Sequence, residues 1–525
     1  MLQKFQEFYN AIKVKPMEVG LTILLLTSIL YTMTQTVTEP DLWGRIKFGN
    51  DVLMLHNPHL VDHYNYVVKN VHWVDIEWLS GVILALAYNI AKTPGLLAVK
   101  FIIVSLILIN IYHNLRNAKF SVLVSILLLS LVVDLISVGT FVIRAHLFTY
   151  LFLGLLISVI LNYRYINKRY LFAIPLIFIF WVNLHGGFIA GLALYGLFVI
   201  SEILCIKLSN DYNNQLAENQ QKITILVLTL VLALGVTLFN PWGFVLLKTI
   251  FVPDTLGRPE IPEWAPLNIL SLNGLFYFVL LFLAIFSFLK SKLKIYLPEF
   301  LIFLILSIVP LIALRHLPLY GVSVVSLISL HLYSAIKQSF LKNLNGFNLV
   351  QLNTQYFFFV CSILLAVMIN FQICKNVFIL KYNDMPYGAM KLLQNTNTKG
   401  NLVVYFNWGE YIIYHLGSMI KVSMDPRREL VYPRNIYNDN IRFTLGVFDW
   451  DDILDKYDTN MVLVPKNIAA YNLMKLKSGY ECVYDDSLSA LFVKQDFKWL
   501  VDLKNAAKKC LSLSTAKTEK EHNFP

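Results

Sequence analysis

The stretch Thr38-Glu39-Pro40-Asp41-Leu42-Trp43-Gly44-Arg45 directly follows the first long hydrophobic run of the chain, residues 19–37. That run is long enough to cross the roughly 30 Å of a bilayer's hydrocarbon core, so Asp41 is expected where membrane meets water. A carboxylate at this boundary can act as a general base that deprotonates or orients an acceptor hydroxyl. The alternative is an interfacial helix-end residue, or the N-cap of a helix that begins at Leu42.

The composition is that of a polytopic membrane protein. Of the 525 residues, 57% are hydrophobic and 15% are charged, whereas an ordinary globular chain is about 25% charged. The five cysteines show no CxxC spacing, and their odd number argues against a full disulfide framework. Apolar runs that predict membrane-spanning helices cover residues 19–37, 96–112, 120–137, 147–163, 170–184, 187–206, 223–239, 272–289, 296–314, 317–336 and 355–373.

One further apolar run, residues 79–90, is short and is followed by Pro94-Gly95, so we expect a helix lying along the membrane surface. With this helix outside the membrane, every Lys/Arg-rich connection falls on one side, which the positive-inside rule makes cytoplasmic. These connections are the N-terminus and residues 116–119, 164–169, 207–222, 290–294 and 337–342. The sequence therefore predicts about 11 crossings, and the net charge of +11 needs no nucleic-acid partner.

Two domains are expected from this topology. Residues 1–375 would form the transmembrane domain, with a first outer loop over 38–95, and residues 376–525 a small extracytoplasmic α/β domain. In the tail we expect strands at 402–406, 420–424 and 461–464, helices at 408–416 and 450–456, and a hairpin of 480–484 with 489–493. Strands alternating with helices predict a partly parallel sheet. Two tail motifs, Trp408-Gly409-Glu410-Tyr411 and Asp425-Pro426-Arg427, lie where α/β folds bind ligands, or serve as cap and turn residues.

Three further acids are candidates for chemistry. Asp75 and Glu77 flank Ile76, so they share a face if the segment is extended and diverge if it is helical. They are a second acid or metal ligand near Asp41, or a solvated rim. Asp134 lies near the outer end of an apolar run. An acid at membrane depth is a functional candidate, and snorkelling to the interface is the alternative.

Cationic residues gather on the predicted outer face, against the positive-inside bias. They are Arg144, His146, His185, Arg315 and His316. An arginine can hold phosphate through two hydrogen bonds, so the set predicts a phosphate or pyrophosphate clamp. Each residue alone could instead pair with a lipid headgroup. Asn183 precedes Gly186-Gly187, which predicts a tight turn with a close backbone approach.

These features resemble the GT-C class of membrane glycosyltransferases, which includes oligosaccharyltransferases, protein O-mannosyltransferases and aminoarabinose transferases. The chain is more closely similar to a widespread group of bacterial membrane proteins that share local motifs. The matching stretches are Pro40-Asp41-Leu42-Trp43, Glu77-Trp78-Leu79, Arg144-Ala145-His146-Leu147-Phe148, Trp181-Val182-Asn183-Leu184-His185-Gly186-Gly187-Phe188, Asn240-Pro241-Trp242-Gly243, Glu263-Trp264, Arg315-His316, and the two tail motifs. The chain departs from the group at Ile76, where a His is expected, and at Pro426, where a Gly is expected. The first departure puts a metal or proton-relay role at that position in doubt, and the second suggests a structural tail motif.

The resemblance implies a sugar transferase of the cytoplasmic membrane that uses a polyprenyl-phosphate-linked donor, with Asp41 as the base. Members of the class differ in whether they use a divalent metal, so the cofactor is left open. In this interpretation the supporting acids are Asp75, Glu77 and Asp134. The donor phosphate is bound by Arg144, His146, His185, Arg315 and His316. The substrate is contacted by Trp43, Asn183, Asn240 and Glu263. A flippase of lipid-linked saccharide would need a polar path through the bilayer, which the few mid-span polar residues disfavour. A non-catalytic membrane scaffold would leave the outer cations unexplained.

Overall fold

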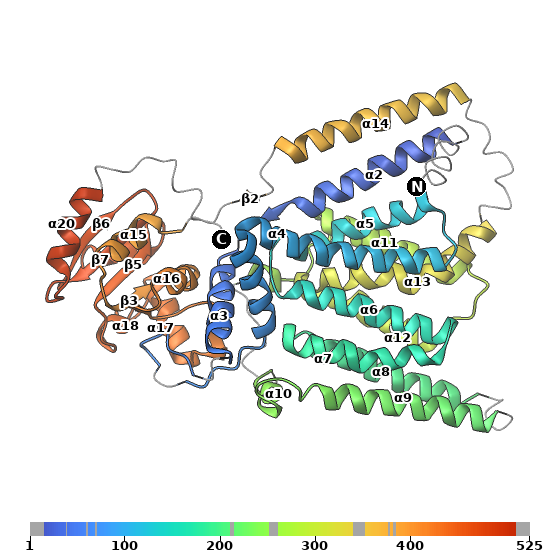
Figure 1. Cartoon of the computed structure of the whole chain (residues 1–525), viewed down its shortest axis with the longest axis horizontal. Coiled ribbons are helices and arrows are strands. Elements are labelled where there is room, and N and C mark those ends of the chain that lie inside the picture. The colour runs from blue at the N-terminus through green and yellow to red at the C-terminus, as the bar shows by residue number, and fades with distance from the viewer. Residues whose placement is uncertain are drawn as a thin grey trace. The chain divides into compact units, whose positions relative to one another are not determined.

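The computed structural model describes residues 15–37, 39–58, 61–68, 71–209, 215–250, 261–339, 352–375, 379–381 and 385–510 (Figure 1). Most of the predicted N-terminal connection, and parts of the basic loops 207–222 and 337–342, lie outside these residues. The chain divides into two compact units. Unit 1 comprises Met1–Val37, Leu97–Asn240 and Gly257–Leu380, and unit 2 comprises Thr38–Leu96, Pro241–Leu256 and Lys381–Pro525.

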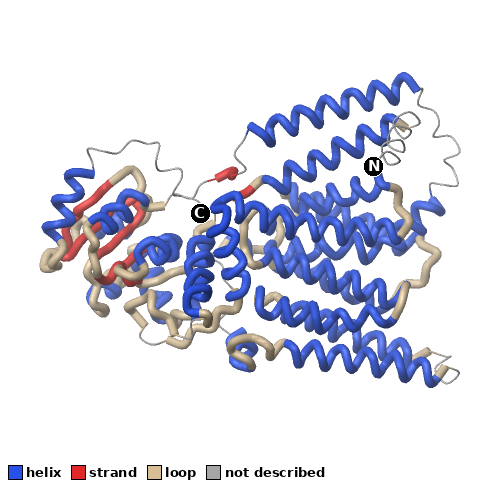
Figure 2. The backbone as a smooth tube through the Cα atoms, viewed as in Figure 1, coloured by secondary structure: helices blue, strands red, loops and turns tan. Residues whose placement is uncertain are grey.

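Unit 1 is built from apolar helices that run side by side (Figure 2). Its helices are α2 (Pro16–Thr34), the second part of α4 (Trp78–Asn117), α5 (Val122–Thr140), α6 (His146–Tyr165), α7 (Ile174–Leu184), α8 (Phe188–Lys207), α9 (Leu216–Val236), α11 (Leu272–Lys290), α12 (Leu297–Ile312), α13 (Leu317–Ser339) and α14 (Leu352–Lys375). Short 3-10 turns connect them at η1 (Lys168–Ala173), η3 (Pro262–Trp264) and η4 (Leu314–His316), and β1 (Thr36–Val37) follows α2.

Eight helices of the described chain are long and apolar enough to cross a membrane, which makes this an integral membrane protein. They are α2, α4, α5, α6, α8, α9, α11 and the segment Leu314–Gln338, which overlaps α13. The predicted number of 11 crossings stays a prediction. Two of these helices begin with a side-chain cap. The hydroxyl of Ser121 accepts the N–H of Val124 at the start of α5, and that of Ser271 accepts the N–H of Gly274 in α11.

The helix predicted over residues 79–90 is present as the first part of α4. Regular helical geometry breaks at Ala91 and Lys92, the latter with φ 52° and ψ −141°. Pro94 explains the break, because proline has no N–H and its ring clashes with the preceding turn of a helix. The part before the break belongs to unit 2, and the remainder from Leu97 belongs to unit 1.

Unit 2 contains a five-stranded sheet with the order β4-β3-β5-β7-β6. Its strands are β3 (Gly400–Val404), β4 (Ile420–Val422), β5 (Met461–Pro465), β6 (Tyr480–Asp485) and β7 (Ser489–Lys494), close to the predicted ranges. β3 is parallel to β4 and β5, and β7 runs antiparallel to β5 and β6. Successive residues of β5 pack into separate apolar clusters on the two faces, as expected of a strand buried on both sides.

The described helices of unit 2, besides the first part of α4, are α3 (Asp41–Leu55), α10 (Phe244–Ile250), α15 (Tyr387–Asn395), α16 (Gly409–Leu416), α17 (Arg434–Leu445), α18 (Asp452–Asp455), α19 (Ala469–Met474) and α20 (Leu500–Cys510), with turns η6 (Phe406–Trp408) and η7 (Arg428–Leu430). The first outer loop is part of the same unit. Its backbone lies along β4, where the N–H of Val422 donates to Tyr64 at 2.9 Å. The loop thereby covers an edge of the sheet.

The tail motif Asp425-Pro426-Arg427 holds this loop against the sheet. The guanidinium of Arg427 donates to both carboxylate oxygens of Asp425, at 2.8 and 2.7 Å, and pairs with Asp62 of the loop. It also lies 4.6 Å from the ring centre of Trp73 and 4.9 Å from that of Phe48. Burial alone would raise the pKa of the Asp425 carboxyl, but Arg427 holds it below its ordinary value. The motif is therefore structural, as the departure at Pro426 suggested.

Candidate functional site

The start of α3 carries a group of charged side chains within unit 2, which we call the acid–arginine group: Asp41, Arg45, Asp75, Glu77 and Glu410. Asp41 is the first residue of α3, with Pro40 rather than Asp41 at the N-cap. This corrects the alternative in which Asp41 caps a helix that begins at Leu42. An acid in the first helical turn is stabilised by the helix dipole. Arg45 follows one turn later on the same face.

Arg45 forms ion pairs with both Asp75 and Glu77. Its two terminal nitrogens lie 3.3 Å from Oδ1 of Asp75 and 2.7 Å from Oε2 of Glu77. Oδ1 of Asp75 also accepts the backbone N–H of Glu77 at 3.0 Å, which fixes the turn between them. Asp75 is 6% exposed and Glu77 8%, so they do not form a solvated rim. Burial alone would lower the pKa of the Arg45 guanidinium, but the surrounding acids, Glu77 and Asp75 first, keep it above its ordinary value.

Glu410 reaches this group from α16 in the tail. It is 1% exposed, and its Oε2 has no hydrogen-bond partner among the described residues. Gly44 makes the approach possible, because a Cβ at that position would lie 2.0 Å from Oε2 of Glu410. Burial, and then the negative charge of Asp41, raise the pKa of the Glu410 carboxyl well above its ordinary value. Burial likewise raises the pKa of Asp75. Glu410 therefore holds its proton more tightly than an exposed glutamate.

Unit 1 brings together four of the predicted cations and one acid, which we call the histidine–arginine group: Arg144, His146, His185, Arg315 and Glu263. All five lie in turns or at helix ends. One terminal nitrogen of Arg144 donates to both oxygens of Glu263, at 3.2 and 3.0 Å. The charge of Arg144 is thus balanced within the chain. Arg315 stacks over Trp264 at 4.5 Å, beside that ion pair.

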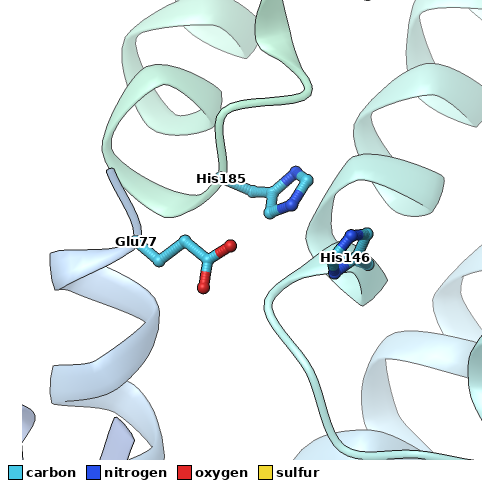
Figure 3. A group of neighbouring side chains, drawn as sticks. All are labelled: Glu77, His146 and His185. Carbon is cyan, nitrogen blue, oxygen red and sulfur yellow. The ribbon is translucent and has the colours of Figure 1, made fainter. Parts of the chain in front are cut away.

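The two histidines lie ring to ring, with centroids 4.3 Å apart (Figure 3). Glu77, the third side chain drawn there, belongs to unit 2. A guanidinium nitrogen of Arg315 lies 2.9 Å from Nε2 of His146. Since arginine can only donate, Nε2 of His146 accepts and a neutral His146 carries its proton on Nδ1.

His185 is held in the opposite tautomer. Its Nδ1 accepts the backbone N–H of Gly187 at 2.9 Å and lies 2.7 Å from the hydroxyl of Thr149. The indole N–H of Trp181 donates to that hydroxyl oxygen, which leaves the hydroxyl proton for Nδ1. A neutral His185 therefore carries its proton on Nε2. Gly187 is needed because a Cβ there would lie 2.4 Å from Oγ1 of Thr149.

An apolar cavity of about 290 Å³ adjoins these side chains inside unit 1. Thr149, Trp181, Gly187 and His316 are among the residues that line it. Its other walls are Leu153, Ala190, Gly191, Ala193, Leu194, Leu197, Ile305, Leu306, Val309 and Leu319, from α6, α8, α12 and α13. Apart from Thr149, Trp181 and His316, the described lining offers only apolar side chains and glycine.

Five predicted site residues do not join either group. One of them, His316, lines the apolar cavity. The amide of Asn183 donates to the carbonyls of Ile179 and Phe239, and that of Asn240 to Thr237, so both amides satisfy helix ends. Trp43 is buried against Tyr411 and Tyr414 and packs the core of unit 2. Among the described residues, the carboxylate of Asp134 has no hydrogen bond or ion pair.

Sequence reasoning missed two members of the acid–arginine group. Arg45 stands in the quoted stretch four residues after Asp41, which on a helix places both on one face. Glu410 stands in the tail motif Trp408-Gly409-Glu410-Tyr411, for which both a ligand role and a cap role were open. Its contact with α3 joins distant parts of the sequence, and no local pattern signals it.

The fold is that of the GT-C membrane glycosyltransferases. Among solved structures, the chain is similar to the oligosaccharyltransferase AglB from Archaeoglobus fulgidus in complex with an inhibitory peptide and a dolichol-phosphate, with TM-score 0.52 and 12% identity over 85% of this chain and 69% of that one. It is also similar to ArnT from Cupriavidus metallidurans in the apo state, with TM-score 0.50 and 11% identity over 90% and 97%. No protein-family model and no curated protein sequence matches the chain. At these identities the likeness concerns the fold alone.

Proposed function

We propose that the chain is a membrane glycosyltransferase that moves a sugar from a polyprenyl-phosphate carrier to an acceptor on the outer face of a bacterial cytoplasmic membrane. The observation that carries the proposal is the acid–arginine group at the start of α3, placed directly after the first apolar helix in a chain with the GT-C fold. The orientation follows the positive-inside rule, with a cytoplasmic N-terminus and an extracytoplasmic tail.

Asp41 is the proposed base. As a bond forms between the acceptor and the anomeric carbon, the acceptor loses its proton to Asp41 and the carbon–oxygen bond to phosphate breaks. The departing phosphate takes that electron pair and leaves as polyprenyl phosphate. Arg45, fixed by Asp75 and Glu77, keeps a positive charge one turn from Asp41. Burial and the charge of Asp41 raise the pKa of the Glu410 carboxyl, which disfavours a second negative charge beside the base.

The histidine–arginine group is proposed to bind the donor phosphate. Arg315 is the strongest candidate because Arg144 already pairs with Glu263. The Nε2–H of His185 is a second donor, since Thr149 and Gly187 fix its tautomer. The apolar cavity next to His316 would take the first part of the carrier's prenyl chain. This arrangement separates a polar end for phosphate from a dry channel for lipid.

The first test uses the purified full chain in lipid nanodiscs, with a panel of synthetic polyprenyl-phosphate monosaccharides. We expect the wild-type protein to release free polyprenyl phosphate from at least one of them. Asp41→Asn should lower that rate about 10²- to 10⁴-fold, the usual contribution of a general base, and leave carrier binding unchanged. Asp496→Asn is the matched control, because the Asp496 side chain is 75% exposed in unit 2.

Other outcomes would point elsewhere. Wild-type turnover in Asp41→Asn would remove Asp41 from the chemistry. Movement of an intact lipid-linked saccharide across a vesicle membrane, without sugar release, would identify a flippase. Ala193→Trp tests the carrier cavity separately, since the indole would fill a volume lined by Ala193 and Leu194. It should weaken binding of polyprenyl phosphate while a short water-soluble phosphate still binds.

A further inference from the structure

A second cavity lies in unit 1, at the opposite end of α13 from Arg315. Its volume is about 650 Å³. The helix runs from Leu317 to Ser339 (Figure 1). At 1.5 Å per residue its two ends are about 33 Å apart, close to the roughly 30 Å thickness of a bilayer's hydrocarbon core. The cavity is therefore distinct from the apolar one beside His316.

The described lining of this cavity is cationic, and none of its residues is acidic. The three lysines are Lys119 in the turn after α4, Lys292 in the α11–α12 connection and Lys337 near the end of α13. Asn117, Ser334 and Gln338 add neutral polar groups. None of the three lysines forms an ion pair with any residue that the structure describes. Three ammonium groups around one hollow, without an ion-pair partner in the described part of the chain, favour a polyanionic or phosphate-bearing ligand.

Apolar side chains complete the lining and adjoin it. Leu293, Leu330 and Tyr333 line the same cavity, and the ring of Tyr333 packs edge-on against Phe120 at 5.6 Å. Leu293 and Leu289, at the same helix end, are exposed in the protein alone and would contact lipid in a membrane. A ligand with a charged head and an apolar body fits this combination better than a small soluble anion does.

We propose that this cavity binds the headgroup of an anionic phospholipid at the membrane surface opposite the histidine–arginine group. The three lysines come from loops that the sequence analysis assigned to the cytoplasmic side. The positive-inside bias accounts for lysines at this end of the bundle. It does not account for three of them around one hollow, whereas basic pockets between membrane helices on that side are known to hold anionic headgroups. The proposal is independent of the glycosyltransferase function.

The test is lipid binding to the full chain in detergent, followed by native mass spectrometry and by thermal unfolding. Phosphatidylglycerol should bind and raise the unfolding temperature, and phosphatidylcholine should do neither. The triple variant Lys119→Gln, Lys292→Gln, Lys337→Gln should bind phosphatidylglycerol about tenfold more weakly or worse. Lys292→Gln alone should give a smaller loss, and an unchanged unfolding temperature without lipid would show that these variants fold.

The matched control is the triple variant Lys168→Gln, Arg169→Gln, Lys207→Gln. These residues lie at the same end of the bundle, beside α6 and α8, and outside the cavity. The control should bind phosphatidylglycerol as wild type does. If both triple variants lose phosphatidylglycerol binding equally, the effect depends on net charge alone, and the proposed site is wrong. Inorganic pyrophosphate is the soluble probe, and saturation by it without any preference for phosphatidylglycerol would overturn the lipid assignment.

Discussion

Glu410 and Asp41 are two carboxyl groups of the acid–arginine group that differ in burial. Glu410 is enclosed by α3 and α16, and burial raises its pKa well above the ordinary value. Asp41 is partly exposed in the first turn of α3, where the helix dipole favours a negative charge. Different environments for neighbouring carboxyl groups can separate their pKa values, and here burial raises that of Glu410. The proposed base at Asp41 depends on such a separation.

The raised pKa of Glu410 predicts a pH-dependent stability. The folded protein holds this proton more tightly than the unfolded chain, whose glutamate pKa is about 4.3. The free energy of unfolding therefore falls as pH rises from about 4.3 through the raised folded value. Glu410→Gln cannot ionise, so it should reduce this fall and be more stable than wild type at neutral pH. Thermal unfolding in detergent between about pH 4.5 and 8 measures it.

The control for this prediction is Glu481→Gln. Glu481 pairs with Lys504 at the surface of unit 2, and its side chain is 42% exposed. Its removal should leave the slope of stability against pH unchanged, because surface pairs contribute little. A Glu410→Gln curve that runs parallel to that of wild type would mean that the fold does not favour the protonated acid.

At the scale of elements, the contact between α3 and α16 depends on Gly44. In an open helix position Gly→Ala stabilises by about 0.8–1 kcal/mol, because alanine is the better helix former. At Gly44 we expect the opposite sign, since the new Cβ would meet the Glu410 carboxyl and the backbone of both helices is packed. Gly44→Ala should lower the unfolding temperature, and the double variant Gly44→Ala, Glu410→Ala should recover part of the loss.

Gly196→Ala is the comparison, because a Cβ at Gly196 in α8 meets nothing within 4 Å. It should leave the unfolding temperature unchanged or raise it. If Gly44→Ala behaves like Gly196→Ala, α3 and α16 can move apart without loss of stability. The packing of α3 then does not fix the position of Glu410. Failure of the double variant to recover any stability would mean that Gly44 matters for a reason other than Glu410.

Most helices and strands could be predicted, because each depends on a pattern in its own stretch of sequence. Apolar runs marked the long helices of unit 1, and alternating tail segments marked β3, β5 and the β6–β7 hairpin within a few residues. Pro94 marked the break in α4. The number of membrane crossings was less accessible, because short apolar helices such as α7 are ambiguous by length alone.

The composition of the site was predictable only in part. Asp75 and Glu77 were singled out, but their shared partner Arg45 was not. Charge alone suggested a five-member phosphate clamp, whereas Glu263 already neutralises Arg144 and hydrogen bonding fixes the tautomers of both histidines. Such pairings depend on which turns meet in space. A single sequence carries no local signal for that.

At the scale of the whole molecule, unit 2 is discontinuous in sequence. Its larger apolar core contains Trp43, Phe48, Tyr64 and Trp73 of the first loop together with residues of the tail. Arg427 of the tail is buried against three of these rings and against Asp62. The predicted division between residues 375 and 376 would leave this loop with the membrane domain. The loop and the tail share one core, so each is expected to need the other to fold.

That dependence can be tested with soluble fragments. We expect residues 385–510 alone to unfold without a cooperative transition, because they would expose the core face that Trp43, Phe48 and Trp73 cover and would leave Arg427 without Asp62. A fusion of residues 39–75 to residues 385–510 through a flexible linker should unfold cooperatively and give dispersed amide signals in NMR spectra. In the same fusion, Trp43→Asp should abolish this gain, since it buries a charge beside Tyr411. If the tail fragment folds as well alone as in the fusion, the tail is an independently folding domain and does not need the loop.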